Sequence, residues 1–340
     1  MEDLLKRLIA TPSFSGEEGQ ATDILEEWLK RHSLDVKRKG NNLFLRSHIH
    51  DGKSILLNAH IDTVRPTSTW TRDPFMPTTE GDRLYGLGSN DDGASLVAMI
   101  ATFIELQDRY NITLSLTAEE ETSGKGGLEF ILPELGQFDF CIIGEPTQMR
   151  AAISERGLLV IDAEAEGKSG HAARNSGINA IYIALDDICQ LRQHEFSRIS
   201  PTMGKVQLNV TQITAGTAHN IIPDRCSFVI DIRPTEQYTN EEIFNELQTI
   251  CRSRLKARNL RNHSSATPQH SPLMHAIQAV GIETFSSPTT SNWMRIPFPA
   301  IKIGPGDSTR SHMADEYICL SEIEQGIKGY IDIISEINNS

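Results

Sequence analysis

The sequence predicts an α/β protein in which one domain is interrupted by a second domain of the α+β class. Up to residue 150, short apolar runs alternate with helical patterns, which is typical of a mixed, largely parallel sheet with helices on both faces. From 151 to 265 the pattern changes to a β-α-β-β-α-β series, and from 266 to 340 the first pattern returns. The length of 340 residues is enough for two domains. We therefore expect residues 1–150 and 266–340 to form one domain and residues 151–265 to be inserted in it.

The composition is that of a globular protein with an acidic surplus. The formal net charge is −13, which argues against nucleic acid or an anionic membrane as a partner. No apolar run reaches the roughly 18 residues that span a bilayer, and the N-terminus lacks the pattern of a secretory signal. The five cysteines are far apart, odd in number and mostly within apolar runs, which indicates reduced thiols. We expect a cytoplasmic protein that binds neither nucleic acid nor membranes.

The first domain opens with a helix. Ser15 and Glu18 have the spacing of a capping box, and apolar residues recur at helical intervals from residue 17 to 33. A Gly-rich turn, YGLGSNDDG, then leads into an apolar helix. The remaining elements follow from apolar runs of suitable length: strands at 42–47, 54–60, 112–117 and 138–144, and helices at 94–107 and 125–135.

The inserted domain reads as an antiparallel sheet with two helices on one face. Its last helix is expected to run from residue 240 to 258, and a polar stretch at 259–271 to be the exit linker. The other predicted elements are strands at 157–167, 204–216 and 225–234, a helix at 177–193, and, back in the first domain, a helix at 272–281, a strand at 299–306 and a helix at 321–337.

Three neighbouring carboxylates, Glu119, Glu120 and Glu121, directly follow the apolar run ITLSLT. Like charges this close repel one another, and burial without a partner is costly, so the side chains either point into water or face something positive. In open α/β sheets, ligands gather at the carboxyl ends of the strands. Other metal-competent residues also follow predicted strands or turns, so that distant segments can meet in one crevice: His60, Asp62, Asp91, Asp92, Glu145 and His312.

Each of these residues alone has a structural interpretation. A single histidine after a strand is more often a hydrogen-bonded structural residue than a ligand, and three glutamates in a row usually form a solvated edge. The combination of two histidines with several carboxylates in one domain is instead the donor set of a divalent metal. The absence of cysteine from these segments argues against a structural zinc finger.

Five motifs follow one another along the chain: HIDTV, GLGSNDDG, TAEEETSGKG, GEPT and HMADEY. In this order they resemble a known family over nearly the whole chain, the co-catalytic di-zinc exopeptidases and deacylases. That family includes acetylornithine deacetylase, succinyl-diaminopimelate desuccinylase, aminoacylase and carboxypeptidase G. The segments LTAEEETS, IIGEPTQ and IKIGPGDSTRSHMADEY are most similar to the acetylornithine deacetylase branch.

The resemblance implies a zinc-exopeptidase-like catalytic domain that holds two Zn²⁺ ions per subunit, for which Co²⁺ could substitute. It implies that His60 and Glu145 bind one ion, that Glu121 and His312 bind the other, and that Asp91 bridges both. Two such ions polarise a substrate carbonyl and activate a shared water.

The resemblance also assigns the residues around the metals. Glu120 is implied as the general base, which takes a proton from water and returns it to the leaving amine. Asp62 is implied to hydrogen-bond the outer nitrogen of His60 and thereby fix its tautomer. Glu119 is then a structural residue, and a cis peptide is implied after Asp91.

The inserted domain resembles the lid and dimerisation domain of the family. The resemblance implies a homodimer through this domain, with His171 reaching the catalytic site of the neighbouring subunit to stabilise the oxyanion. Asn220 and Arg233 are candidates for binding a substrate carboxylate, since arginine can form a bidentate pair. The alternatives are a surface histidine near a helix start, a turn asparagine and an exposed strand arginine.

The activity implied is hydrolysis of the amide bond of a small N-acyl-L-amino acid, such as N-acetylornithine or another N-acyl-ornithine or N-acyl-citrulline of arginine biosynthesis. The motifs do not choose among these acyl groups and amino acids, and Asn292 stands where desuccinylase-type relatives often have aspartate. A succinyl-diaminopimelate desuccinylase-like or di- or tripeptidase activity is an alternative. A non-catalytic binding protein with a relict site is a further one, but the presence of Glu120 argues against it.

Overall fold

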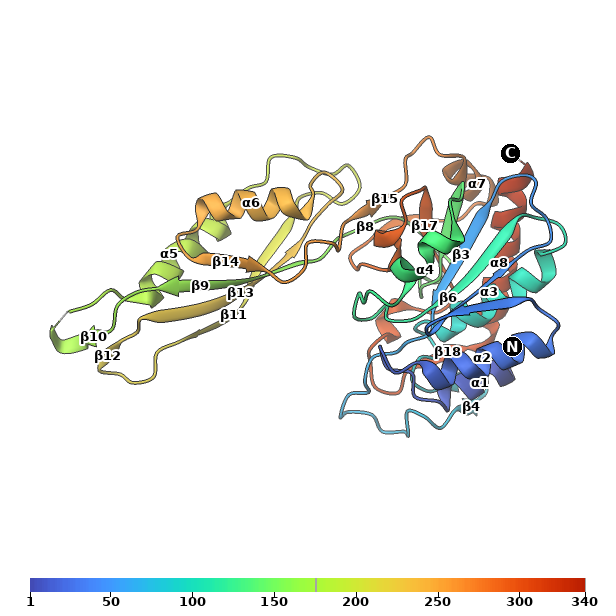
Figure 1. Cartoon of the computed structure of the whole chain (residues 1–340), viewed down its shortest axis with the longest axis horizontal. Helices are drawn as coiled ribbons and strands as arrows, with labels where there is room; N and C mark the ends of the chain where they lie inside the picture. The colour runs from blue at the N-terminus through green and yellow to red at the C-terminus, as the bar shows by residue number, and fades with distance from the viewer. Residues whose placement is uncertain (175, 340) are drawn as a thin grey trace. The chain divides into compact units, whose positions relative to one another are not determined.

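The computed structural model describes residues 1–174 and 176–339, which divide into two compact units. Unit 1 comprises Met1–Ile153, Ala266–Phe285 and the residues from Ser291 onward. Unit 2 comprises Ser154–Ser265 together with the short segment Ser286–Thr290. Each unit has its own hydrophobic core, and both termini belong to unit 1 (Figure 1).

The sheet of unit 1 is mixed, and its centre is parallel. Four adjacent central strands run in the same direction in the order β6 (Ile112–Thr117), β3 (Ile55–His60), β7 (Phe140–Ile143) and β17 (Ala300–Lys302). The predicted mixed, largely parallel sheet is therefore confirmed. Further strands extend the sheet on both sides: β1 (Val36–Lys39), β2 (Asn42–Arg46), β8 (Ala151–Glu155), β15 (Ser265–Ala266) and β16 (Thr284–Ser287).

Helices cover both faces of this sheet because its central strands are apolar on both sides. Leu57 of β3 packs into one core and Leu56 into the other. The face of Leu56 is covered by α4 (Leu128–Leu135) and the short helix η2 (Asn292–Arg295). Five helices contribute to the core of the other face (Figure 1): α1 (Glu2–Ile9), α2 (Gly19–Arg31), α3 (Gly93–Leu106), α7 (Pro272–Val280) and α8 (Leu320–Asn339).

A buried amide network lies on the Leu56 face, beside the ends of β3 and β6. Asn58 Nδ2 donates to Ser115 Oγ and to Thr117 Oγ1, both at 3.0 Å. Asn292 Nδ2 donates to Asn58 Oδ1 at 3.0 Å and to Thr117 Oγ1 at 3.1 Å. An aspartate at position 292 has no group that could donate these two bonds. Asn292 therefore joins η2 to the two strands that lead into the candidate site.

A small three-stranded sheet completes unit 1. Its order is β18 (Tyr317–Cys319), β5 (Arg83–Tyr85) and β4 (Thr78–Glu80). Since β5 precedes Asp91 and β18 follows His312, the antiparallel pairing of these strands brings two of the predicted metal-binding segments together.

Unit 2 is an antiparallel sheet packed against two helices. Its strand order is β11 (Gln207–Ala215), β13 (Arg225–Arg233), β9 (Leu159–Glu166) and β14 (Arg254–Ala257). Alternate residues of β13 are buried, as expected for a sheet with one covered face. The helices α5 (Ala180–Gln193) and α6 (Asn240–Ile250) supply the rest of this core. A separate two-stranded ribbon pairs β10 (Gly170–His171) with β12 (Ile221–Ile222). The short helix η1 (Ala172–Arg174) directly follows β10.

The helix predicted for residues 240–258 is wrong in its second half. α6 ends at Ile250, and residues 254–257 form β14, which pairs antiparallel with β9. Asp187 of α5 accepts the N–H groups of Arg252 and Ser253 at 2.9 and 2.8 Å, so that the chain turns at this point. These contacts come from distant residues and are invisible to a local helical pattern.

The predicted capping box at the start of α2 is also wrong. Glu18 occupies the N-cap position, but no side chain caps the helix. Ser15 instead donates to Asp62, which follows β3, and Glu18 accepts the N–H of Glu119, which follows β6, as described below.

Asp187 is a fully buried carboxylate whose two backbone bonds hold the α6–β14 connection. We expect Asp187→Ala to lower the free energy of unfolding by about 1–3 kcal/mol, because the N–H groups of Arg252 and of the buried Ser253 lose their acceptor. Chemical denaturation measures this change. The exposed neighbour Asp186 provides the control, since Asp186→Ala should leave stability within about 0.5 kcal/mol of wild type. Equal stability of the two variants would contradict the role of Asp187.

Candidate active site

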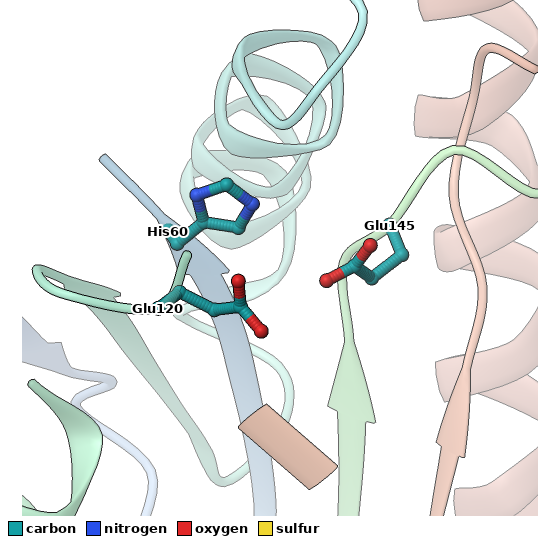
Figure 2. A group of neighbouring side chains, drawn as sticks. All are labelled: His60, Glu120 and Glu145. Atoms are coloured by element: carbon teal, nitrogen blue, oxygen red, sulfur yellow. The ribbon is translucent and has the colours of Figure 1, made fainter. Parts of the chain in front are cut away.

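The candidate site lies at the carboxyl ends of three adjacent parallel strands. His60 is the last residue of β3, Glu120 follows β6, and Glu145 follows β7. Their side chains point toward a common space (Figure 2), and one ligand atom from each lies within 4.8 Å of the other two. Parallel strands end at the same edge of a sheet, so residues far apart in the sequence meet there.

Asp91 lies between two histidines. His60 Nε2 is 3.2 Å from Asp91 Oδ1, and His312 Nε2 is 3.7 Å from Asp91 Oδ2. His312 Nε2 is also 3.0 Å from Glu121 Oε1, so that the four side chains form a continuous chain of contacts. His60, Asp91 and Glu121 make up a second group whose ligand atoms lie within 4.8 Å of one another. The structure thus brings together all five residues expected to bind metal.

Asp62 contacts His60 in a way that differs from the expectation. Nδ1 of His60 lies 2.8 Å from the backbone carbonyl oxygen of Asp62 and 3.6 Å from its carboxylate oxygen Oδ1. The carboxylate instead accepts the N–H groups of Glu120 and Glu121 at 2.9 and 3.0 Å, and the hydroxyl of Ser15 at 2.6 Å. Asp62 therefore fixes the histidine through its backbone and the two glutamates through its side chain.

Glu18 supports the same segment from the N-terminal side. Its Oε1 accepts the N–H groups of Gly16 at 2.6 Å and of Glu119 at 3.2 Å, and its Oε2 accepts Asn41 Nδ2 at 2.9 Å. Together with the bonds to Asp62, each of the three consecutive glutamate N–H groups is bonded to a buried carboxylate. This use of Ser15 and Glu18 explains why neither side chain caps α2.

Glu119 has the backbone conformation and packing of a structural residue. Its φ of 57° lies in the left-handed region, and its Oε2 accepts the N–H of Gly126 at 2.9 Å. A Cβ atom on Gly124 or Gly126 would lie 2.1 or 2.3 Å from a carboxylate oxygen of Glu119. The glycines of the GKGG segment therefore leave room for this side chain.

The site concentrates negative charge away from water. Burial raises the pKa of Glu120 to about 8, and the neighbouring carboxylates Glu121, Asp62 and Asp91 act in the same direction. Burial likewise raises the pKa of Glu145 well above its usual range, reinforced by Asp91 and Glu120. These raised pKa values show that too little positive charge surrounds the two carboxylates to keep them ionised.

Both histidines respond to the same negative field. The bond to Glu121 raises the pKa of His312 to about 9. Burial opposes protonation of His60, yet its contacts with Asp62 and Asp91 raise its pKa well above the usual value. A divalent cation between these side chains would supply the missing positive charge and displace the protons. Two imidazoles with carboxylate oxygens suit such a cation, so the residues present fit a divalent metal.

The turn that carries Asp91 has the expected backbone. The peptide bond between Asp91 and Asp92 is cis, which confirms the implied geometry. Asp92 is buried, and its Oδ2 accepts the N–H of His60 at 3.3 Å. The turn thus contacts the backbone of β3 as well as the imidazole of His60.

The three remaining candidates lie in unit 2. His171 is in β10, and the pairing of β10 with β12 places it beside Asn220, whose carbonyl oxygen accepts the N–H of Ala172 at 3.0 Å. Arg233 is the last residue of β13 and pairs with Asp231 through Nε and Oδ1 at 2.8 Å. The strand β13 starts only shortly after Asn220, so its length of about 27 Å separates Arg233 from Asn220.

Two groups of supporting residues were missed in the sequence. The spacing of Ser15 and Glu18 predicts a local cap, but Ser15 bonds to Asp62 and Glu18 to Glu119, which are 47 and 101 positions away in the sequence. Glu316 received no role, yet its carboxylate accepts three backbone N–H groups next to Asp91. Its position in HMADEY, four residues after the predicted ligand His312, is the signal that could have identified it.

Sequence comparisons find related proteins over most of the chain. Residues 56–336 match the model of peptidase family M20/M25/M40. The chain is 31% identical over 356 residues to an acetylornithine deacetylase of Edwardsiella ictaluri, with 93% of this chain and 92% of the relative covered.

Solved structures share the fold at lower identity. Aminopeptidase PepT from Bacillus cereus superposes with a TM-score of 0.81 at 17% identity, covering 99% of this chain and 97% of that one. A dinuclear metal-binding M20 peptidase from Bacillus subtilis superposes with a TM-score of 0.77 at 14% identity, with coverages of 99% and 97%. The family match extends over most of the sequence, and the chain belongs to peptidase family M20/M25/M40.

Proposed function

We propose that the protein hydrolyses the amide bond of a small N-acyl-L-amino acid with two Zn²⁺ ions bound at the carboxyl ends of β3, β6 and β7. The observation that carries the proposal is the position of Asp91, which presents one oxygen to His60 and the other to His312. A carboxylate between two imidazoles suits a ligand shared by two metal positions. The Bacillus subtilis relative, described as dinuclear, supports two ions over one.

The proposed ligand sets follow the contacts of the side chains. His60 and Glu145 complete the first position with Asp91, while Glu121 and His312 complete the second. Zinc accepts imidazole and carboxylate ligands readily, and Co²⁺ is expected to replace it because it accepts the same donors. When bound, the metal pair polarises the scissile carbonyl and lowers the pKa of water.

Glu120 is proposed as the proton carrier. Its carboxylate belongs to the cluster with His60 and Glu145, and the bond from its N–H to Asp62 fixes its backbone. An ionised Glu120 accepts a proton from the attacking water and then donates it to the leaving amine, so one residue serves as base and acid. Asp62 orients this base and His60 at the same time.

The acyl amino acid is proposed from the relatives. Acetylornithine deacetylase from Edwardsiella ictaluri is similar over 93% of this chain, whereas the superposed peptidases share less than 20% identity. N-acetylornithine is therefore the first candidate substrate, followed by other N-acyl-ornithines and N-acyl-citrullines of arginine biosynthesis. Because the superposed PepT is an aminopeptidase, peptides are the second candidate class of substrate.

We further propose a homodimer through unit 2. Of the ten exposed large apolar side chains among the described residues, seven lie in unit 2, although it is the smaller unit. The strand β11 lies at an edge of the sheet and offers unpaired backbone groups, which a second copy can satisfy symmetrically. The seven side chains are Ile178, Ile181, Tyr182, Leu185, Ile199, Ile213 and Ile221.

In this dimer His171 is proposed to complete the site of the partner subunit. Asn220 lies beside His171 and would accompany it, whereas Arg233 is a strand length away and would serve a different copy of the site. This division lets His171 stabilise the oxyanion while Asn220 and Arg233 contact the substrate carboxylate from two subunits.

The proposed location is the cytoplasm. All five cysteines are free, and Cys141 and Cys226 are buried, which suits a reducing compartment. Among the described residues, no helix combines the length and the apolar character that crossing a membrane requires.

A substrate panel tests the proposed activity. We expect zinc-dependent hydrolysis of one or more of N-acetylornithine, N-acetylcitrulline, N-succinylornithine and N-succinylcitrulline, and slower turnover of a dipeptide panel. The matched variant Glu120→Gln keeps the shape of the side chain but cannot take up a proton, so kcat should fall by about 10²–10⁴ with unchanged metal content. No turnover of any acyl amino acid, or a Glu120→Gln variant with normal kcat, would overturn the proposal.

The stability of the metal-free protein should fall as pH rises. Glu120 has an ordinary pKa near 4.5 and a raised pKa of about 8 in the fold, so between these values the folded state binds more protons than the unfolded state. His312, raised from 6.5 to about 9, acts in the same direction. The melting temperature of chelator-treated protein should therefore decrease between pH 5.5 and 8.5.

Bound zinc should weaken this dependence of stability on pH, because zinc binds the deprotonated form of its ligands. We expect the melting temperature with excess zinc to fall less over the same range, and Glu120→Gln to flatten the profile of the metal-free protein. A metal-free wild type that becomes more stable toward pH 8.5 would contradict the charge excess described for this site.

The role of His171 across the dimer can be tested by mixing two inactive variants. His171→Ala should impair kcat without loss of metal, and Glu120→Gln should do the same. After dissociation and reassociation, a mixed dimer pairs an intact Glu120 in one subunit with an intact His171 in the other. When equal amounts are mixed, half of the dimers are mixed dimers and each of these has one complete site. About a quarter of all sites should therefore be active. A mixture that stays inactive, or full activity of His171→Ala alone, would remove His171 from the partner's site.

A further inference from the structure

Two loops that carry predicted metal ligands are hydrogen-bonded to each other in unit 1. The first loop, residues 86–92, contains Asp91, and the second, residues 304–316, contains His312. More than 200 residues separate them in the sequence. Neither loop belongs to the central sheet, so its position depends on contacts other than the strand ladder.

Glu316 forms one half of this connection. Its side chain is buried, with 2% of the residue exposed. Oε1 accepts the N–H groups of Asn90 and Asp91, both at 2.9 Å, and Oε2 accepts the N–H of Gly88 at 3.1 Å. The carbonyl oxygen of Glu316 also accepts the N–H of Gly86 at 3.0 Å. A single residue of the second loop thus binds four backbone donors of the first.

Asn90 forms the other half. Its Oδ1 accepts the N–H of Asp307 at 2.9 Å, and its Nδ2 donates to the carbonyl oxygen of Asp307 at 3.1 Å and to Ser311 Oγ at 3.3 Å. Gly306, with φ of 84°, permits this approach, because a Cβ atom there would lie 2.4 Å from Asn90 Oδ1. The bonds of Asn90 end at the residue that precedes His312.

The two histidines of the site depend on this connection to different degrees. His60 belongs to β3, is 3% exposed and has its ring nitrogen beside the carbonyl of Asp62. The side chain of His312 is 54% exposed, and its backbone has a left-handed φ of 59°. Since packing holds His312 only weakly, its position relative to Asp91 depends on its bond to Glu121 and on the loop connection.

We propose that Glu316 and Asn90 are positioning residues that set the affinity of the second metal position, formed by Asp91, Glu121 and His312. This inference rests on the ligand sets given under the proposed function. Loss of the connection lets Asp91 and His312 move apart, whereas Glu145 and His60 remain on β7 and β3. The connection acts on the metal through Asp91 and His312 and does not require contact with substrate.

The test measures metal affinity without relying on activity. Wild type, Glu316→Ala and Glu316→Gln are titrated with Co²⁺ against a competing chelator, and the visible absorption of each bound equivalent is recorded. For Glu316→Ala we expect one equivalent to bind 10- to 100-fold more weakly, as is typical when a residue that orients a ligand is lost. The other equivalent shares Asp91 but keeps His60 and Glu145 at the strand ends, so its affinity should fall by a clearly smaller factor.

Glu316→Gln serves as the variant that keeps the shape of the side chain. Its remaining carbonyl oxygen can accept the N–H groups of Asn90 and Asp91, while its amide group cannot accept that of Gly88. We expect a smaller weakening at the same equivalent. Asp187→Ala is the matched structural control, because Asp187 is a buried carboxylate of unit 2 that also accepts two backbone N–H groups. It should lower stability without changing either affinity.

A His312→Ala variant separates failure of this inference from failure of the proposed ligand sets. If His312→Ala loses one equivalent while both Glu316 variants bind two with wild-type affinity, the inference is wrong and the ligand sets stand. Equal weakening of both equivalents in Glu316→Ala also overturns the inference. If His312→Ala keeps two equivalents, the ligand set itself is wrong.

Discussion

Backbone N–H groups bonded to buried carboxylates hold the site together. Asp62 accepts two such groups and Glu18 accepts a third, so the segment after β6 is fixed at three consecutive residues. Glu316 does the same for the turn that precedes α3. Charge-assisted bonds of this kind are stronger than neutral ones and can offset the cost of burying a carboxylate. The strand ends supply the direction of the candidate ligands, and these carboxylates fix the backbone that carries them.

The carboxylates of the site therefore serve two physical purposes. The nearby His60 ring, 3.6 Å from the carboxylate, and the hydrogen bonds from Ser15 and from the backbone N–H of Glu120 lower the pKa of Asp62 in spite of its burial, so that it stays ionised as a support. Glu120 and Glu145 have raised pKa values, because burial and neighbouring charges dominate there. A buried acid that can change its protonation state near neutral pH suits proton transfer, whereas one held ionised suits the orientation of its neighbours.

The sequence carried enough information for the sheet and for the place of the site. Alternating apolar runs predicted the central strands, and the position of His60 and Glu145 at strand ends placed both at one edge. The pairing of ligands with individual metals came from family resemblance, since spacing alone does not determine it. Ser15 and Glu18 were misread because a three-residue spacing fits a helix cap as well as two separate long-range bonds. The end of α6 was misplaced because Asp187 and β9, which terminate it, are distant in the sequence.

The division of the chain into two units has a consequence for the order of assembly. Unit 2 is nearly continuous, from Ser154 to Ser265, and only Ser286–Thr290 joins it later. Unit 1 needs α7, β17 and α8 from the last part of the chain to close its core. During synthesis from the N-terminus, unit 2 can therefore fold on the ribosome before α7, β17 and α8 of unit 1 have been made. The candidate site, whose last residue in the sequence is His312, can close only after that residue has been synthesised.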